Sequence, residues 1–300
     1  MKKVLLSIIM ASTLLNAGGY KVPEQSADSL GLAASNVAFS FGADAAYFNP
    51  ANMMFLDGRH HIESTLGWFH INKLEFKSDS GKSYRSEKFD SLAGTFSFVT
   101  PEIYENWKFG LALAVPAAVG VSWEDPATAF TAKRFKLQVV ELNPTVAYRI
   151  NDKLAVALGA RGVYTKGKIA SDFGRIGYRE IKGDGMGYGY NVALTYRPIE
   201  DLSFAVTYRS NVNLELKGHT DADFNGAPIS YHGKTRVEIP LPAQLVLATG
   251  YKFSNFTLLL AFERTYWSKF KGYDFEYMDK GPAHSHPAFA RFMDDPVIKN

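Results

Sequence analysis

Cysteine is absent from this chain of 300 residues. Without cysteine there is no disulfide framework and no thiolate metal site. Charge of one sign is also scarce, because 33 basic and 30 acidic side chains leave a net charge of +3, too little to suggest a nucleic acid as partner. After residue 17 no apolar run reaches the length of a membrane-spanning helix. If the chain enters a membrane, strands must carry it.

The first residues have the parts of a bacterial export signal. Met1-Lys2-Lys3 is a short basic end, residues 4–15 are mostly apolar, and Ala17-Gly18-Gly19 supplies small residues. The apolar part is too short to cross a bilayer, although a membrane anchor or a buried first helix is the alternative. We therefore expect residues 1–17 to be a signal peptide. The mature chain is then periplasmic, secreted or an outer-membrane barrel.

From about residue 59 the side chains alternate with a period of two, which predicts strands. In residues 187–197, large side chains such as Tyr188 and Tyr190 alternate with Gly, Asn, Ala and Thr. The same pattern occurs in 107–116, 154–164, 202–209 and 256–263. The small face is rich in Gly and Ala, whereas the surface of a soluble sheet carries mainly Lys, Glu and Thr, so a membrane barrel fits better than a soluble β-sandwich. The predicted fold class is all-β, a transmembrane antiparallel β-barrel.

The alternation predicts nine strands, at 59–76, 88–99, 107–123, 134–150, 154–173, 178–197, 202–217, 236–253 and 256–277. Long connections (77–88, 124–133, 218–235) alternate with short ones (151–153, 198–201, 254–255), as in barrels with tight periplasmic turns. Residues 278–300 would begin an outer loop. Single-chain bacterial barrels have an even number of strands. We therefore expect the chain to be incomplete, with a miscounted strand or completion by another chain as alternatives.

The segment between the leader and the first strand has a different character. Residues 23–41 predict a helix with a stripe of small or apolar residues at Ser26, Ala27, Leu30, Ala33, Ala34 and Val37. The following stretch, AAYFNPANMMF (45–55), must turn at Asn49-Pro50, because proline fixes its own φ and restricts the preceding residue. Its bulky apolar side chains need a cavity or a wall to pack against.

Four stretches resemble the FadL family of outer-membrane transporters for long-chain fatty acids and aromatic hydrocarbons. They are GGYKVPEQSADSLGLAASNVAF, DAAYFNPANM, FGLALAVPAAVGVSW and AFERTYWSKF. The resemblance implies a barrel of fourteen strands, about nine of them present here in 59–277, with an N-terminal helical hatch (18–58) inside the lumen. It also implies a kink in the third strand that opens a gap sideways toward lipid.

The resemblance assigns roles to individual positions. Tyr20 and Val22 would line a substrate pocket, although Tyr20 could simply pack within the hatch. Hatch seating and gating would depend on Asn49, Pro50, Ala51, Pro116 and Gly120. Pro116 lacks a ladder donor and Gly120 lacks a side chain, which suits a break in pairing, although Pro116 could also mark an ordinary strand end. Residues 117–119 (Ala-Ala-Val) depart from the aromatic-Gly pair that is usual there.

Other candidate binding residues lie further along the chain. Phe130 and Phe224, on predicted long loops, are candidates for capturing substrate. Arg161, Arg197 and Arg209 face the lumen by parity. They could meet a substrate carboxylate, or they could pair with acidic groups in the lumen and brace the barrel.

No enzyme, cofactor or metal motif stands out. Residues 183–189 (GDGMGYG) have glycines at every second position of a strand and lack the Lys-Ser/Thr of a phosphate loop. His60-His61 and His284-Ser285-His286 have no accompanying cysteine or clear carboxylate set. No pattern marks a catalytic serine and histidine.

The predicted function is passive uptake of a long-chain fatty acid or an aromatic hydrocarbon across a Gram-negative outer membrane. A loop groove would capture the molecule, the lumen would bind it, and a hatch movement would release it sideways into outer-membrane lipid. The expected state is monomeric. A general porin, which would have a charged, water-filled constriction, is the alternative, followed by a structural or adhesin barrel.

Overall fold

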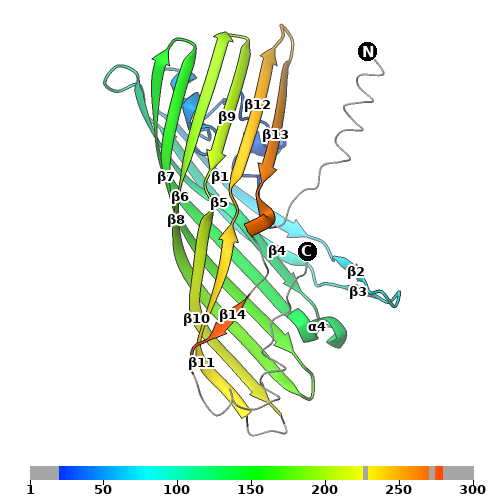
Figure 1. Ribbon diagram of the computed structural model, residues 1–300. Helices are drawn as coiled ribbons and strands as arrows, with labels where there is room; N and C mark the ends of the chain where they lie inside the picture. Colours follow the sequence, from blue (N-terminus) through cyan, green and yellow to red (C-terminus); the bar gives the residue numbers. More distant parts are fainter. Residues whose placement is uncertain (1–19, 226–228, 270–273, 280–300) are drawn as a thin grey trace.

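The computed structural model describes residues 20–225, 229–269 and 274–279. Twelve strands form one antiparallel sheet that curls around the N-terminal segment (Figure 1). They are β1 (His61–Ile71), β4 (Phe89–Val99), β5 (Trp107–Ser122), β6 (Arg134–Asn151), β7 (Leu154–Asp172), β8 (Gly177–Ile199), β9 (Leu202–Arg209), β10 (Val212–Phe224), β11 (Ile229–Leu241), β12 (Gln244–Lys252), β13 (Thr257–Thr265) and β14 (Phe275–Tyr277). In these ranges no ladder joins β1 to β13 or β14.

The described wall consists of nine passes, as the alternation predicts. β9 and β10 run end to end along β8, β11 and β12 run along that pair, and β13 and β14 complete the ninth pass. The predicted single strand at 202–217 is therefore wrong in detail, because it is interrupted between Arg209 and Val212. Within the part of the chain that the structure describes, no helix is both long and apolar enough to cross a membrane.

The predicted long loop at 218–235 is also wrong. Thirteen residue pairs of β10 and β11 are in register, from Val212 opposite Leu241 to Phe224 opposite Ile229. Thr220, Ala222 and Phe224 point inward and are buried, whereas the side chains between them are polar and point outward. The strand pattern was not recognised here because the outward residues are polar, whereas the other strands were identified by an apolar outer face.

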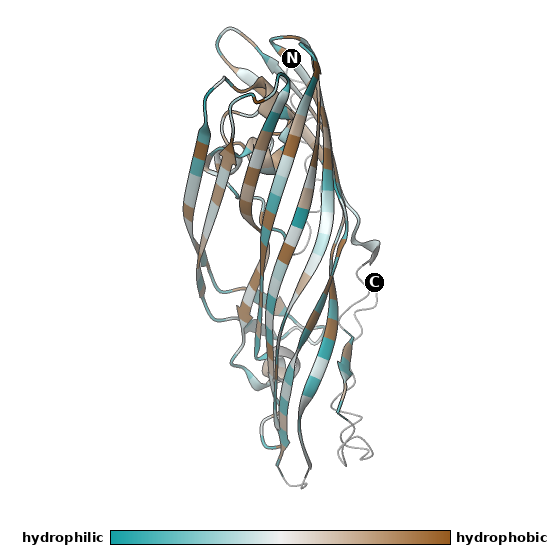
Figure 2. Ribbon diagram, turned by 90° about the vertical axis from the view of Figure 1, so that its left-hand side faces the viewer, coloured by the Kyte–Doolittle hydropathy of each residue, from teal (hydrophilic) through white to brown (hydrophobic). Residues whose placement is uncertain are grey.

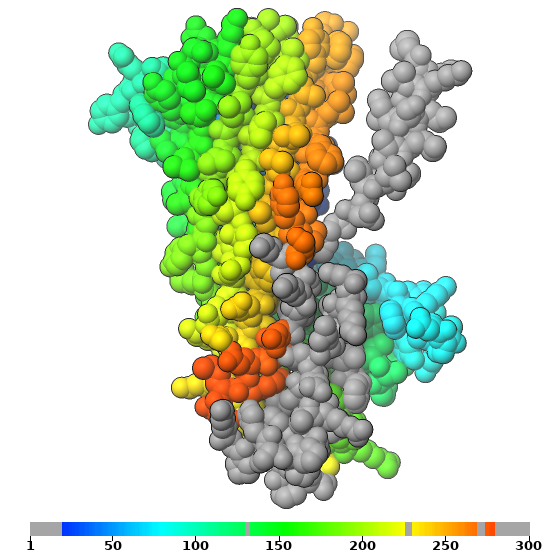
Figure 3. All heavy atoms as spheres, in the orientation of Figure 1, coloured from blue at the N-terminus to red at the C-terminus, as the bar shows by residue number. Residues whose placement is uncertain are grey.

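The two ends of the wall differ. Tight turns join β6 to β7, β8 to β9 and β12 to β13, and the N-terminal segment lies at that end (Figure 1). At the other end lies α4 (Pro126–Ala132). The predicted loop 77–88 contains part of a hairpin of β2 (Glu75–Lys77) and β3 (Ser83–Arg85), which projects sideways from the wall (Figures 1 and 3). Short turns are typical of the periplasmic end of such barrels, so α4 marks the outer end.

Residues 20–58, which we call the hatch segment, contain three short helices: α2 (Ala27–Gly31), α3 (Ala45–Phe48) and the 3₁₀ helix η1 (Pro50–Phe55). The predicted helix at 23–41 is wrong beyond α2. Ser26 caps α2, and its side chain accepts a hydrogen bond from the Ser29 amide. Ala33 and Ala34 have positive φ angles of 49° and 58°, which end the helical path. The small residues that suggested a helix therefore serve a compact turn.

The small inward face of the wall makes room for the hatch segment. Met53, Met54 and Tyr47 pack with inward alanines of β5 to β8, namely Ala112, Ala114, Ala147, Ala155, Ala157 and Ala193. Large side chains such as Tyr188 (75% exposed) and Leu158 (54% exposed) point outward. Bands of differing hydropathy follow one another along the strands (Figure 2). The period of two thus separates the outer surface from a hatch-filled interior.

The outer half of the interior contains a second apolar cluster, which the sequence reading did not anticipate. Inward side chains of β6, β7, β8, β10 and β11 form a second cluster. Its members include Leu137, Val139, Val163, Ile181, Leu214, Leu216 and Ile239. Beyond the hatch segment, the passage is therefore bordered by large hydrocarbon side chains.

We predict that Gly110→Ala displaces the hatch segment. A Cβ at Gly110 would lie 2.5 Å from Met53 Sδ, 2.7 Å from Thr145 Oγ1 and 2.9 Å from the Ala46 Cβ. Relieving this overlap should cost about 1–3 kcal/mol and raise protease cleavage within residues 20–58. Gly162→Ala is the control, because its Cβ would meet nothing closer than the Leu142 carbonyl oxygen at 3.9 Å. Equal cleavage of both variants would contradict the prediction.

Candidate functional site

The wall has a break between β4 and β5. The ladder between these strands contains four pairs, from Val99 opposite Gly110 to Phe96 opposite Leu113. Beyond Leu113 the ladder ends, and the next backbone bond across this boundary is the Glu87 amide to the Ser122 carbonyl, at 2.8 Å. Between these two closures lies a lateral opening, by which we mean the unpaired stretch of β4 and β5.

β5 also carries an extra residue at this point. Ala114 pairs with Glu141 and Ala117 pairs with Val139, so Val115 and Pro116 together face Val140. Proline has no backbone donor, which suits it to such a bulge. The inward-facing positions change from even numbers before the bulge to odd numbers after it. Pro116 therefore lies at the break itself rather than at a strand end.

The start of the hatch segment pairs with the broken strand. The Val22 amide donates to the Pro116 carbonyl at 3.0 Å, and the Ala118 amide donates to the Tyr20 carbonyl at 2.9 Å. Lys21 lies opposite Ala117 as an isolated bridge. Residues 20–22 thus supply part of the pairing that β4 does not give to β5.

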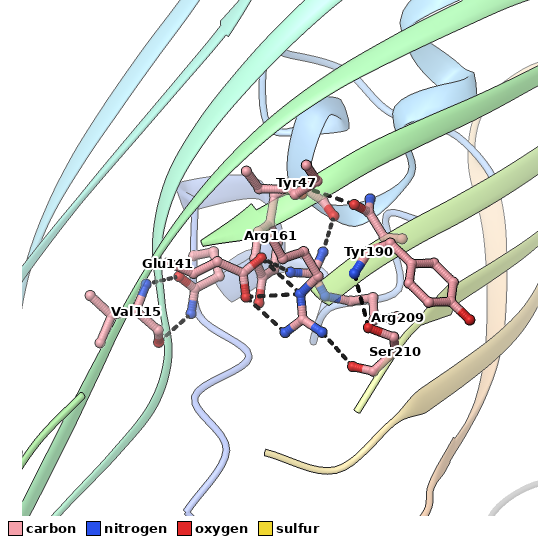
Figure 4. A network of polar contacts seen from close by, with 11 residues as sticks. Tyr47, Val115, Glu141, Arg161, Tyr190, Arg209 and Ser210 are labelled. Carbon is pink, nitrogen blue, oxygen red and sulfur yellow. Dashed lines mark hydrogen bonds and ion pairs between the residues drawn. The ribbon is translucent and has the colours of Figure 1, made fainter. Parts of the chain in front are cut away.

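Gln25 supplies the rest and is 5% exposed. Its side-chain amide donates to the Val115 carbonyl at 2.9 Å, and its side-chain oxygen accepts from the Val115 amide at 2.8 Å. Figure 4 shows both bonds at Val115. The Gln25 carbonyl accepts from Thr95 Oγ1 of β4 at 2.6 Å. One hatch residue therefore bridges the two strands where their own ladder is missing.

A cavity of about 450 Å³ occupies the lateral opening. From the interior it is lined by Val22, Val119 and Leu137, and from β4 by Phe89, Ser91, Ala93 and Gly94. Its remaining lining includes side chains of the outer face, among them Leu113, Val140 and Tyr164. The cavity thus connects the hatch side of the wall with its outer surface.

Gly120 lies at the outer end of this cavity. A Cβ there would come within 2.3 Å of the Phe89 ring, so the ring lies directly against the glycine backbone. The structure therefore brings Gly120 and Pro116 to the same break in β5. Phe89, which the sequence reading did not select, is the side chain that occupies the space left by the missing Cβ.

A buried ion network lies next to the bulge (Figure 4). Glu141 is fully buried and bonds both Arg161, at 2.8 Å, and Arg209. Arg161 also donates to the Ser210 carbonyl at 2.6 Å, and Arg209 donates to the Tyr47 carbonyl at 3.1 Å. Two guanidinium groups share one carboxylate, so the network carries net positive charge. Within the described chain, both arginines are engaged by protein groups.

Arg197 has different neighbours. Its guanidinium lies over the rings of Phe55, at 4.1 Å, and Phe39, at 4.9 Å, both in the hatch segment. A cation over an aromatic face is attracted by the ring quadrupole. Arg197 therefore holds hatch side chains rather than a carboxylate.

Two further wall cations bind hatch carbonyl groups, and the sequence reading missed both. Lys108, 1% exposed, donates to the Leu56 and Asp57 carbonyls, each at 2.8 Å. Arg149 donates to the Met54 carbonyl at 2.5 Å. These carbonyls lie at the end of η1, where helical partners are missing. For Lys108 the sequence did contain a signal, because it is the charged residue on the face of 107–116 that otherwise consists of Gly, Ala and Pro.

The Asn-Pro-Ala stretch lies against the inner wall. The Asn49 side-chain amide donates to the Val37 carbonyl at 2.8 Å and to Thr195 Oγ1 of β8 at 2.9 Å. Its side-chain oxygen accepts from the Ala51 amide at 3.2 Å, across Pro50. These three residues are buried, and η1 packs on β5, β6, β7 and β8 rather than on the third strand alone.

The other predicted binding residues are scattered. Tyr20 donates to the Pro240 carbonyl at 2.6 Å and meets the Trp267 ring edge-on, at 5.3 Å. Phe224 is not on a loop, because it ends β10 and packs inward beside Phe173. Its predicted position on a long loop is therefore wrong. Phe130 lies in α4, but its side chain falls outside the described residues, as do the leader at 1–17 and the histidines at 284 and 286.

A wall that surrounds an N-terminal segment and opens sideways defines the class of protein: an outer-membrane barrel of the FadL type. Residues 8–289 match the family described as "Outer membrane protein transport protein (OMPP1/FadL/TodX)", and the chain belongs to this family. This confirms the predicted all-β barrel, the outer-membrane location and the family. The family consists of transport proteins rather than enzymes.

Relatives and solved structures agree with this assignment. The Escherichia coli K12 "Long-chain fatty acid transport protein" is 25% identical over 268 residues, which cover 75% of this chain and 59% of that protein. Haemophilus influenzae "Outer membrane protein P1" is 22% identical, with 90% and 71% covered. The chain thus spans about three-fifths of the E. coli relative.

Among solved structures, a Pseudomonas aeruginosa FadL homologue superimposes with a TM-score of 0.76 at 18% identity, covering 87% of this chain and 72% of that one. The P. putida toluene transporter TodX gives 0.66 at 18% identity, with 80% and 69% covered. At this level of identity the likeness concerns the fold.

Gln25→Leu should loosen the lateral opening. The variant leaves the amide and carbonyl of Val115 without partners, and each loss costs about 1–3 kcal/mol. We expect faster hydrogen exchange at the Val115 amide, measured by mass spectrometry of the β5 peptide. Gln244→Leu, in β12 and outside the lining of this cavity, is the control and should leave exchange unchanged. Unaltered protection in Gln25→Leu would show that Gln25 does not hold the strand.

The hatch segment should weaken as pH rises. Burial raises the pKa of Asp44 to about 7 from 3.8, and Glu63 and Asp28 add to the rise, whereas hydrogen bonds from Ser26 and Asn36 oppose it. Between these values the folded state holds a proton that the unfolded state has lost. Stability should therefore be highest below about pH 4 and fall as pH increases through about 7.

Thermal unfolding followed by tryptophan fluorescence at pH 5 and pH 8 measures this effect. Asp44→Asn, which is neutral at both values, should show a smaller difference between them. A difference as large as that of the unsubstituted protein would mean that another group is responsible.

Proposed function

We propose that this protein carries hydrophobic molecules, long-chain fatty acids or aromatic hydrocarbons, across the outer membrane and releases them sideways through the lateral opening. The observation that supports this most directly is the cavity of about 450 Å³ between β4 and β5. Its lining is largely apolar and includes both hatch and outer-surface residues. The names of the E. coli relative and of the toluene transporter indicate these two substrate classes.

An apolar molecule gains by passing between dry surfaces. Burial is worth about 0.8 kcal/mol per methylene group, so a route through water is unfavourable for a long chain. The apolar cluster in the outer half of the interior would receive the molecule first. The cavity beside Val22 would hold it next, and Val140 and Tyr164 on the outer face would pass it to lipid. In this proposal Phe130, in α4 at the outer end, contributes to capture.

Gating would come from the hatch segment. Residues 20–25 bond β5 at Val115, Pro116 and Ala118, so a shift of this short stretch would free the break. Tyr20 also bonds β11, and Lys21 pairs with Glu263 of β13. The stretch therefore crosses the interior and links both sides of the wall. Substrate that displaces Val22 would act on this link, while Asn49, Pro50 and Ala51 keep the rest of the hatch in place.

The arginines would brace the wall. Arg161 and Arg209 neutralise Glu141 and hold backbone carbonyls, so a fatty-acid carboxylate would have to compete with Glu141 for them. We propose that the protein acts as a monomer. A general porin is the alternative, but it calls for a charged, water-filled constriction. In the described interior the charged groups Glu141, Arg161 and Arg209 are buried and paired, beside the hatch segment and an apolar cluster.

Ala118→Trp tests the lateral route. Ala118 lines the cavity, and an indole there should fill it, so uptake of a radiolabelled fatty acid or of toluene should fall roughly tenfold. Ala160→Trp, on the outer face of β7, is the control, because it adds the same side chain away from the opening. Single-channel recording should find low ion conductance throughout. Unchanged uptake in Ala118→Trp, or large conductance without hydrophobe uptake, would contradict the proposal.

A further inference from the structure

The outer surface of the wall carries a row of basic side chains. Lys136 of β6 lies opposite Lys168 of β7, and Lys168 lies opposite Lys182 of β8. Lys182 lies opposite His219 of β10, which in turn lies opposite Lys234 of β11. All five positions are on the outward-facing side of their strands. Like charges directly across a ladder destabilise a sheet, so this row calls for an anionic partner.

The row lies at one edge of the apolar outer surface. On β7 the outward side chains from Leu154 to Tyr164 are apolar or small, and Lys166 and Lys168 follow toward the outer end. On β8 the apolar outward stretch begins at Met186, and Lys182 lies just beyond it. A strand needs about 9–11 residues to cross the hydrocarbon core. The lysines are therefore placed where the outer leaflet ends and its headgroups begin.

The side chains enclose a place for a ligand. A depression of about 560 Å³ on this surface is lined by Lys136, Lys166, Lys168 and Lys182, with Gln138, Asp184, His219 and three glycines. The glycines, Gly167, Gly183 and Gly218, are in register on three adjacent strands. These glycines are at inward-facing positions, so only their backbone forms the floor of the depression between the lysine side chains.

The acidic residues nearby leave part of this charge unpaired. Glu180 bonds Lys168, at 2.6 Å, and Lys182. Asp184 accepts a hydrogen bond from Tyr164, at 3.3 Å. Over the described residues, neither Lys136 nor Lys166 has a carboxylate within ion-pair distance. Two of the four lysines therefore share one carboxylate, and the other two, Lys136 and Lys166, are available to bind a ligand.

We propose that this lysine depression binds the phosphorylated headgroup of lipid A in the outer leaflet. Strands are about 4.8 Å apart, so Lys136, Lys168 and Lys182 present ammonium groups over about 10 Å, which suits a headgroup that carries more than one phosphate. Acyl chains of the same lipid would lie along Tyr164, Met186 and Tyr188, below the lysines. The inference depends on the outer-membrane location and not on the transported molecule.

The site adjoins the lateral opening. Gln138 and Lys166 line both the lysine depression and the cavity between β4 and β5. Lys136 also reaches the Phe89 ring, with its ammonium 6.0 Å from the ring centre. A lipid held here would form one border of the region into which the opening leads, and it would fix the height of the opening in the leaflet.

Binding of lipid A by the detergent-purified full chain tests this proposal. The probes are bisphosphorylated lipid A, monophosphorylated lipid A and phosphatidylglycerol, with native mass spectrometry as the readout. Changing Lys136, Lys166, Lys168 and Lys182 together to Gln should weaken binding of bisphosphorylated lipid A about tenfold or more. The matched control changes four exposed lysines of the projecting hairpin region to Gln, namely Lys73, Lys77, Lys82 and Lys88. This control should bind like the unsubstituted protein.

A folding check keeps the test decisive. The gel mobility shift of the unheated barrel reports whether each variant is folded. If the fourfold variant fails to fold, the double variant Lys136→Gln with Lys166→Gln replaces it, because this double variant removes no described ion pair. Weaker binding by this pair, with normal binding by the hairpin control, supports the proposal. Equal affinity in all variants, equal loss in the control, or equal binding of phosphatidylglycerol would overturn it.

Discussion

The structure depends on one constraint: peptide groups that are withdrawn from water must find partners. The pairing of β5 is interrupted at Val115 and Pro116. Its ladder with β4 ends at Leu113, and its ladder with β6 contains a bulge of one extra residue at a proline that has no backbone donor. Gln25 and residues 20–22 restore those bonds from inside. A wall with a hole in it remains folded because the N-terminal segment acts as a local substitute for a strand.

The same constraint explains the charges in the interior. The hatch segment has short helices and turns, so several of its carbonyl groups lack partners of their own. The wall supplies cations to them, from Lys108, Arg149 and Arg209. The Arg197 guanidinium lies over two aromatic rings of the hatch segment. These bonds are specific in position, which is why a segment with little regular structure has one place in the lumen.

The strands were predictable where bulky and small residues alternate, and β4 to β8 begin and end within two residues of the expected positions. The outer halves of β10 and β11, within 218–235, were predicted as a loop, because polar outward residues replace the apolar signal there. The break at Pro116 was predictable from proline chemistry and from family resemblance. Gln25, Phe89 and Glu141 were not, because their roles depend on which distant strand each meets, and local pattern carries no such information. The predicted helix at 23–41 was wrong at Ala33 and Ala34 for a related reason. Alanine favours a helix, but both residues adopt a left-handed backbone conformation in the packed structure.

The bulge in β5 has a consequence for how such a protein can change over generations. One surplus residue moves every later inward position of the strand from even to odd numbers. Removal of one codon at Val115 or Pro116 would leave one residue opposite Val140, so β5 could pair regularly with β6 while Ala117 and Val119 still face inward. The hydrogen bonds that Gln25 now makes to Val115 would then lose their place, so a change of one codon in the wall would alter how the hatch segment is held.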